Sequence, residues 1–224
     1  MNLLAHALLA YATLDDTGGQ ECTGSIMADF FAGQDAADYP AGIRAGMAQH
    51  RDIDGFTDTH PSFIACRRAI AGAGAPRFTA GILTDIFWDH VLASDWKAWG
   101  EPLCGLGLEP FCTVIYGRLG QTKEVHSPGF ARAYSWIVDL SWLASYAELS
   151  GIERTLQGLS TRMSGHLDLA ASIGILASLD GPIRAHFAAF WPDLVDFARG
   201  WAGREITPGA YAGNELKHKP TPSC

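Results

Sequence analysis

The sequence predicts an all-α protein that forms a single helical domain. Apolar residues recur at the helical period along most of the chain, and the Asn-Gly turns that mark β-hairpins are missing. The 224 residues are 48% hydrophobic and 18% charged, which suits one buried core and excludes a wholly disordered chain. We expect the domain to span residues 1–212. After Trp201 the composition turns to Gly, Pro, Lys and Thr, so a poorly ordered tail is expected at 213–224.

Capping and breaking residues set the predicted helix boundaries in the first half of the chain. The opening apolar run ends at residues 15–19, Asp-Asp-Thr-Gly-Gly. Pro40 and Pro61 stand where a helix can begin without losing a hydrogen bond. The helices predicted here cover residues 2–14, 25–31, 40–54, 59–72 and 78–93.

The second half continues the helical pattern after a break. Residues 100–107 are rich in Gly and Pro, and we expect a connection there. The helices predicted beyond it cover residues 108–119, 129–149, 152–163, 165–178 and 181–200. No internal repeat or convincing linker divides the chain.

The charge of the chain argues against broad nucleic-acid binding. The net charge is −8, and no block of basic residues is longer than the pair Arg67-Arg68. Five of the 16 basic residues nevertheless fall between positions 44 and 77; they are Arg44, Arg51, Arg67, Arg68 and Arg77. They either form a local positive patch for an acidic partner or are scattered solvated charges.

Cysteine usage and the opening segment indicate a cytoplasmic protein. The five Cys residues are odd in number and widely spaced, without a Cys-x-x-Cys pair, so neither a disulfide framework nor a zinc ribbon is expected. No Lys or Arg precedes the first apolar run and His6 interrupts it, which argues against a signal peptide. No uncharged apolar stretch reaches the roughly 18 residues of a membrane span, so no membrane contact is expected.

The first cluster of chemically useful residues lies in the predicted helix 78–93. Asp85 and Asp89 are four residues apart and therefore share a helix face, and His90 follows directly. A carboxylate in such an apolar helix needs a compensating cation or compensating hydrogen bonds. Ligation of a divalent ion and a salt-bridged core pair both satisfy that need.

The second cluster, at the end of predicted helix 40–54, combines imidazole and carboxylate. His50 and Asp54 share a helix face, and Asp58 continues it if the helix persists. This mixed nitrogen and oxygen set suits Mn²⁺, Fe²⁺, Co²⁺ or Zn²⁺, and the planar fork of Arg51 can hold a phosphate oxygen. An exposed helix with surface charge pairs is the alternative.

The third pair is His6 in the first helix and Asp29 in the second, each among apolar residues. Either alone is more often a hydrogen-bonded core residue than a ligand. Three separate segments nevertheless place His and Asp in apolar surroundings, and metal phosphohydrolases need such ligands around a bound water. No nucleophile elbow, P-loop or dinucleotide-binding glycine pattern competes with this interpretation.

These residues together resemble a known family. A set of short segments in the first hundred residues is similar, in order and spacing, to the acyl carrier protein phosphodiesterases. The segments are Met1-Asn2-Leu3-Leu4-Ala5-His6, Gly24, Ala28-Asp29-Phe30, Gly42-Ile43, His50-Arg51, Ile53-Asp54, Thr57-Asp58, Asp85, Trp88-Asp89-His90 and Trp96. The resemblance is specific over the first hundred residues and continues weakly to the end. It implies a helical bundle distantly related to the HD phosphohydrolases, although the His-Asp doublet here reads Asp89-His90.

The resemblance also implies an activity, a cofactor and a partner. The activity is removal of the 4′-phosphopantetheine arm from holo acyl carrier protein, a partner in fatty acid biosynthesis. The cofactor is a divalent metal, typically Mn²⁺, and Mg²⁺ or Fe²⁺ are the alternatives. The expected metal ligands are His6, Asp29, His50, Asp54, Asp85, Asp89 and His90. Catalytic roles are expected for Asp29, His50, Arg51 and Asp89, and substrate contacts for Arg44, Arg51, Asp58 and Trp88.

Two other functions fit the same residues. The site could act on a nucleotide or another small phosphoester. A non-catalytic helical binding module, in which the Asp and His residues form only structural ion pairs, is the alternative from a different class. Trp88 and Trp96 are either walls of a groove for the pantetheine arm or ordinary core aromatics.

Overall fold

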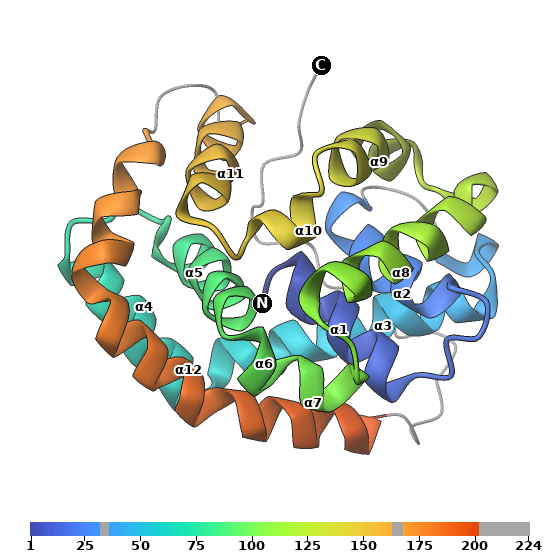
Figure 1. Cartoon of the computed structure of the whole chain (residues 1–224), viewed down its shortest axis with the longest axis horizontal. Helices are drawn as coiled ribbons and strands as arrows, with labels where there is room; N and C mark the ends of the chain where they lie inside the picture. The colour runs from blue at the N-terminus through green and yellow to red at the C-terminus, as the bar shows by residue number, and fades with distance from the viewer. Residues whose placement is uncertain (32–35, 163–167, 202–224) are drawn as a thin grey trace.

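The computed structural model describes residues 1–31, 36–162 and 168–201, and every regular element in these ranges is a helix. The predicted all-α class and single helical domain are confirmed. The α-helices are α1 (Leu3–Thr13), α2 (Gln20–Met27), α3 (Ala41–Thr59), α4 (Pro61–Gly72), α5 (Ala80–Ser94), α6 (Trp96–Trp99), α7 (Glu101–Cys104), α8 (Leu108–Gln121), α9 (Pro128–Asp139), α10 (Trp142–Ser145), α11 (Leu149–Arg162) and α12 (Ile173–Trp201) (Figure 1). The predicted tail at 213–224 lies outside the described residues.

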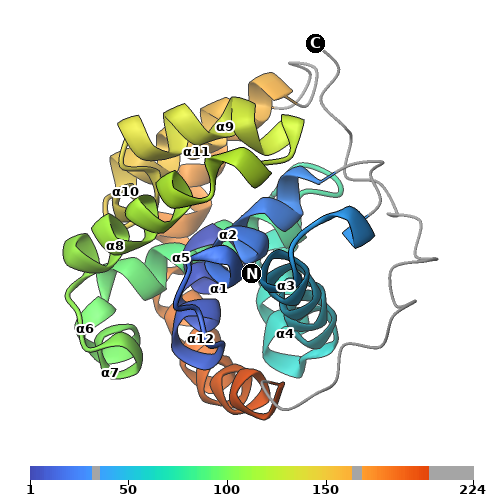
Figure 2. The ribbon, with the colours of Figure 1, turned by 90° about the vertical axis from the view of Figure 1, so that its right-hand side faces the viewer.

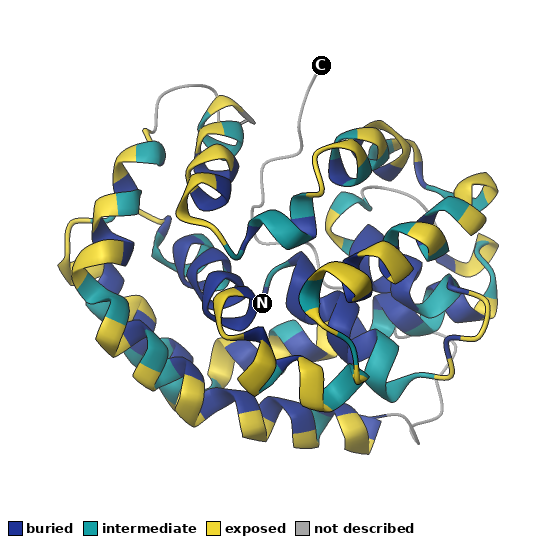
Figure 3. Ribbon diagram, viewed as in Figure 1, coloured by how far each residue is buried: buried dark blue, intermediate teal, exposed yellow. Residues whose placement is uncertain are grey.

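The first helix is the centre of the packing. All residues of α1 from Leu3 to Ala10 are buried, and the helix contacts α2, α3, α5, α7 and α12. Figures 1 and 2 show it surrounded by these helices, and Figure 3 shows the buried faces turned toward it. Because α1 is apolar on every side, His6 in its first turns is carried into the interior.

Glycines allow α2 and α3 to cross with their backbones in contact. A Cβ on Gly24 would lie 2.1 Å from the carbonyl oxygen of Ile43, and one on Gly46 would lie 2.0 Å from that of Glu21. No other residue type fits at these distances without moving a backbone. The crossing holds the end of α2, and the 3₁₀ turn η1 (Ala28–Phe30) after it, against the middle of α3.

Three sequence predictions of local structure were wrong. The break predicted between the helices at 165–178 and 181–200 is absent, because α12 (Ile173–Trp201) runs through Pro182 and Pro192; residues 165–167 lie outside the described residues. Arg184 spans the first proline: its Nε lies 2.9 Å from Asp180 Oδ1 and its Nη1 lies 2.6 Å from Asp95 Oδ2. Packing of α12 on α3, α4 and α5 offsets the hydrogen bond that each proline removes.

The other two corrections concern short segments. Within the expected connection at 100–107, Pro102 lies in the first turn of helix α7, where its missing N–H costs little, and Gly105 (φ 70°) ends that helix. The helix predicted at 129–149 is interrupted before α10, where Ser141 adopts φ 47°. Among the described residues, no helix combines the length and the apolar character that a membrane crossing requires.

We predict opposite effects for two glycine substitutions on α3. Gly46→Ala should destabilise the fold by about 1–3 kcal/mol, because the new methyl group overpacks the crossing with α2. Gly55→Ala should stabilise it by up to about 1 kcal/mol, since nothing lies within 4 Å of that position and Ala is the better helix former. Urea unfolding of both variants measures the difference. A neutral Gly46→Ala would contradict the close crossing.

Candidate metal centre

Side chains from α1 and α3 meet in one buried cluster. His6 Nε2 lies 3.1 Å from Asp54 Oδ1, and His50 Nε2 lies 3.3 Å from Asp54 Oδ2. The two imidazole rings stack with their centroids 3.7 Å apart. One ligand atom of each of these residues lies within 4.8 Å of the other two. We call His6, His50 and Asp54 the metal triad.

Two further carboxylates border the triad. Asp29, in η1, places its Oδ1 3.5 Å from His50 Nε2. Asp85, on α5, places its Oδ1 3.0 Å from the Met1 amine, which also lies 3.3 Å from Asp54 Oδ1. The sequence prediction that distant segments bring His6, Asp29, His50 and Asp54 together is therefore met geometrically, and Asp85 joins them through the amine.

A backbone carbonyl orients His50. Its Nδ1 lies 2.7 Å from the carbonyl oxygen of Ser25. A carbonyl only accepts hydrogen bonds, so Nδ1 carries the proton and Nε2 faces Asp29 and Asp54. Burial lowers the pKa of His50, but the charges of Asp54 and Asp29 outweigh it and raise that pKa to about 9. His6 behaves oppositely: burial, followed by the charge of His50, lowers its pKa to about 4.

The Met1 amine is a fully buried cation beside the triad. Burial works against its charge, yet the carboxylates of Asp85 and Asp54 raise its pKa to about 11. In return, the amine and His50 outweigh the burial of Asp54 and hold the pKa of that carboxyl far below its usual range. Sequence reasoning missed this group because a backbone amine belongs to no side-chain motif.

The composition and exposure of the triad fit a divalent cation. Two imidazoles and a carboxylate are ligands that Mn²⁺, Fe²⁺ and Zn²⁺ accept. The side chains of His6 and His50 are buried, whereas those of Asp54, Asp85 and Asp29 are 35%, 27% and 21% exposed. The cluster therefore opens to solvent on its carboxylate side.

The structure does not place the Asp89-His90 doublet in the triad. Asp89 accepts hydrogen bonds from the backbone N–H groups of Leu4 (2.8 Å) and Ala5 (3.3 Å), so it caps α1 from α5. Asn2, the residue at the cap position, makes no capping bond of its own. Burial raises the pKa of Asp89 to about 7. His90 is directed to the carbonyl oxygen of Tyr146, 2.8 Å from its Nδ1.

The predicted substrate contacts are dispersed. Trp88 is completely buried and packs against Phe63, Phe187 and Phe190, so it is a core residue and not a groove wall. Trp96 is buried as well. Arg44 donates a hydrogen bond to the carbonyl oxygen of Tyr39, 2.8 Å away, which occupies it locally.

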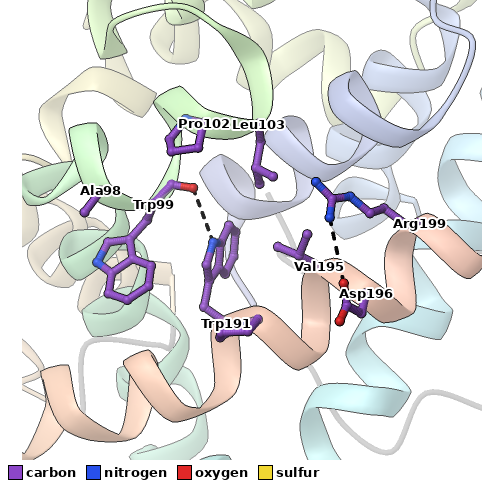
Figure 4. A pocket seen from close by; sticks show the side chains of 9 residues that line it. Ala98, Trp99, Pro102, Leu103, Trp191, Val195, Asp196 and Arg199 are labelled. Carbon is purple, nitrogen blue, oxygen red and sulfur yellow. Dashed lines mark hydrogen bonds and ion pairs between the residues drawn. The ribbon is translucent and has the colours of Figure 1, made fainter.

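Arg51 and Asp58, also expected to contact substrate, are exposed on α3, the helix that carries His50 and Asp54. A separate cleft of about 240 Å³ lies between α6 and α7 on one side and α12 on the other, with Trp99 and Trp191 on its walls (Figure 4). It contains none of the predicted site residues.

We predict that Asp89 acts on stability through the cap of α1. Asp89→Ala should lower the free energy of unfolding by about 2 kcal/mol, because two buried N–H groups lose their acceptor. Asp89→Asn keeps one acceptor oxygen and should cost less. Denaturant unfolding with and without Mn²⁺ checks both variants. A stable Asp89→Ala protein that no longer retains metal would show instead that Asp89 is a ligand.

The family model described as acyl carrier protein phosphodiesterase matches residues 1–194. A relative with that name from Serratia proteamaculans is 30% identical over 199 residues, which cover 89% of this chain and 98% of the relative. One from Yersinia enterocolitica is 33% identical over 201 residues, which cover 89% of this chain and 98% of the relative. One from Photorhabdus laumondii is 31% identical over 191 residues, which cover 85% of this chain and 90% of the relative. No solved structure matches the chain, so the likeness to HD phosphohydrolases stays a prediction. The chain belongs to the acyl carrier protein phosphodiesterase family.

Proposed function

We propose that this protein is a cytoplasmic, metal-dependent phosphodiesterase that releases 4′-phosphopantetheine from holo acyl carrier protein. The family and the names of its relatives support the substrate. The observation that carries the chemistry is the metal triad, with its ligand atoms within 4.8 Å of one another and an opening on the carboxylate side. Mn²⁺ is the proposed cation, with Mg²⁺ or Fe²⁺ as alternatives.

The proposed roles follow from position. His6, His50 and Asp54 hold the cation, and the hydrogen bond from His50 Nδ1 to Ser25 fixes the direction of Nε2. When bound, a divalent cation supplies hydroxide near neutral pH and neutralises charge on phosphoryl oxygens. Asp29, partly exposed beside His50, is placed to accept the proton of the attacking water.

The remaining residues act on the reacting groups or on the position of the site. Water forms the new bond to phosphorus while the bond to the serine oxygen breaks; the arm keeps the phosphate and the serine recovers a proton. Arg51 is proposed to contact phosphoryl oxygens. Asp85 holds the Met1 amine, and Asp89 positions His6 by capping its helix. The proposed distant relation to HD phosphohydrolases rests on His and Asp ligands brought together from separate helices.

We expect the purified protein with Mn²⁺ to convert holo acyl carrier protein to the apo form, as followed by mass spectrometry. His50→Ala and Asp54→Asn should each lower kcat/KM by at least about 100-fold, more than the loss of an outer-shell partner produces. His186→Ala, on α12 and outside the triad, is the matched control. Activity on a nucleotide panel with none on holo carrier would show that the substrate assignment is wrong. Full activity of both triad variants would rule out the site.

Metal binding is predicted to release a proton from His50. The pKa of this side chain is about 9 in the metal-free protein, because Asp54 and Asp29 outweigh its burial. Ligation requires the neutral imidazole, so at pH 7 close to one proton should be released per ion. Affinity for Mn²⁺ should rise about tenfold per pH unit and level off above pH 9. Calorimetry in two buffers of different ionisation enthalpy measures the release. Affinity that does not change between pH 6.5 and 8.5 would contradict it.

A further inference from the structure

An aromatic side chain projects into solvent from the loop between α4 and α5. Phe78 is 85% exposed, the most exposed of the large hydrophobic residues in the described ranges. Its φ is 66°, in the left-handed region that bulky residues rarely adopt. The next residue, Thr79, is buried, and its hydroxyl donates to the carbonyl oxygen of Pro76 at 2.7 Å. Neither packing nor backbone preference explains a phenylalanine at this position.

One arginine lies over this aromatic ring, and two more are exposed on the neighbouring helix α4. The guanidinium carbon of Arg77 lies 4.5 Å from the ring centroid of Phe78. Arg67 and Arg68 are exposed on α4, and Arg67 Cδ lies 3.8 Å from where a Cβ on Gly81 would stand. We call Arg67, Arg68, Arg77 and Phe78 the α4–α5 patch. It concentrates positive charge on a chain whose net charge is −8.

The patch continues the face of α5 that borders the metal triad. Gly81, Asp85 and Asp89 follow one another at intervals of four residues and so lie on one face, about 6 Å apart along the axis. Asp89 is buried against α1, Asp85 is 27% exposed beside the Met1 amine, and Arg67 stands beside Gly81. Asp89 is buried, Asp85 and Gly81 are both half-buried, and the loop before Gly81 is largely exposed (Figure 3). Asp85, the partly exposed carboxylate beside the triad, therefore lies one helical turn from Gly81, which Arg67 borders.

We propose that the α4–α5 patch is the docking surface for the acidic carrier domain of the substrate. Phe78 enters an apolar depression of the carrier, and the arginines pair with carboxylates around it. A carrier seated there can direct its arm along the Gly81–Asp85 face to the triad. The choice of partner rests on the proposed function, and two observations support it: the charge of the patch, and the position of Arg67 beside Gly81, one helical turn from Asp85.

The test separates docking from chemistry by using two substrates. Steady-state kinetics with Mn²⁺ compare holo acyl carrier protein with bis(p-nitrophenyl) phosphate, and calorimetry measures binding of the apo carrier. The variants are Phe78→Asn, which suits the left-handed backbone, and Arg77→Glu. Leu140→Asn and Arg154→Glu are the matched controls; Leu140 is 58% exposed and Arg154 is exposed on α11.

Both patch variants should raise KM for holo carrier and Kd for apo carrier about tenfold or more, with kcat and hydrolysis of the small diester unchanged. Phe78→Asn should melt no lower than the parent protein, and the controls should match the parent. A change of KM below twofold in both variants overturns the proposal, and so does an equal loss on both substrates. A parent protein that binds carrier through Phe78 without cleaving it would reject the proposed function and keep the docking surface. A parent that does not bind carrier at all rejects both.

Discussion

The carboxylate of Asp54 is the group on which this site depends. Its side chain is 35% exposed, and a carboxylate partly withdrawn from water is costly unless cations or donors surround it. Three partners do so here: His6, His50 and the Met1 amine, at 3.1, 3.3 and 3.3 Å. Met1 and His6 lie at the start of α1, and His50 lies on α3 with Asp54. The contacts that stabilise the charge of Asp54 therefore also fix how α1 packs against α3.

The rest of the fold holds those partners in place by ordinary packing. Gly24 and Gly46 let α2 approach α3 closely. The carbonyl oxygen of Ser25 is therefore near enough to accept the hydrogen bond that His50 Nδ1 donates. Asp89 anchors the first turn of α1 through the N–H groups of Leu4 and Ala5, and that turn carries His6. A change in either support would alter the direction of His50 or His6 without replacing either side chain, and residues that hydrogen-bond to metal ligands act in this way.

The sequence predicts those features of the site that depend on the spacing of residues along a helix. His50 and Asp54 share a face at i, i+4, and the apolar surroundings of His6 placed it in the interior. The same spacing also pairs Asp85 with Asp89, yet Asp89 bonds to the backbone of α1, a partner that no side-chain pattern reveals. The continuation of α12 through Pro182 likewise depends on tertiary contacts, since local preference alone favours a break.

The balance of charge explains why this cluster is suited to a divalent ion. Asp29, Asp54 and Asp85 are three carboxylates, whereas the metal-free site offers two cations, the Met1 amine and protonated His50. The cluster therefore keeps an excess negative charge, which would repel a phosphodiester. Exchanging the His50 proton for a divalent ion makes the positive and negative charges equal. A site neutralised in this way would no longer repel an anionic phosphodiester, and the proposed α4–α5 patch would supply positive charge outside it.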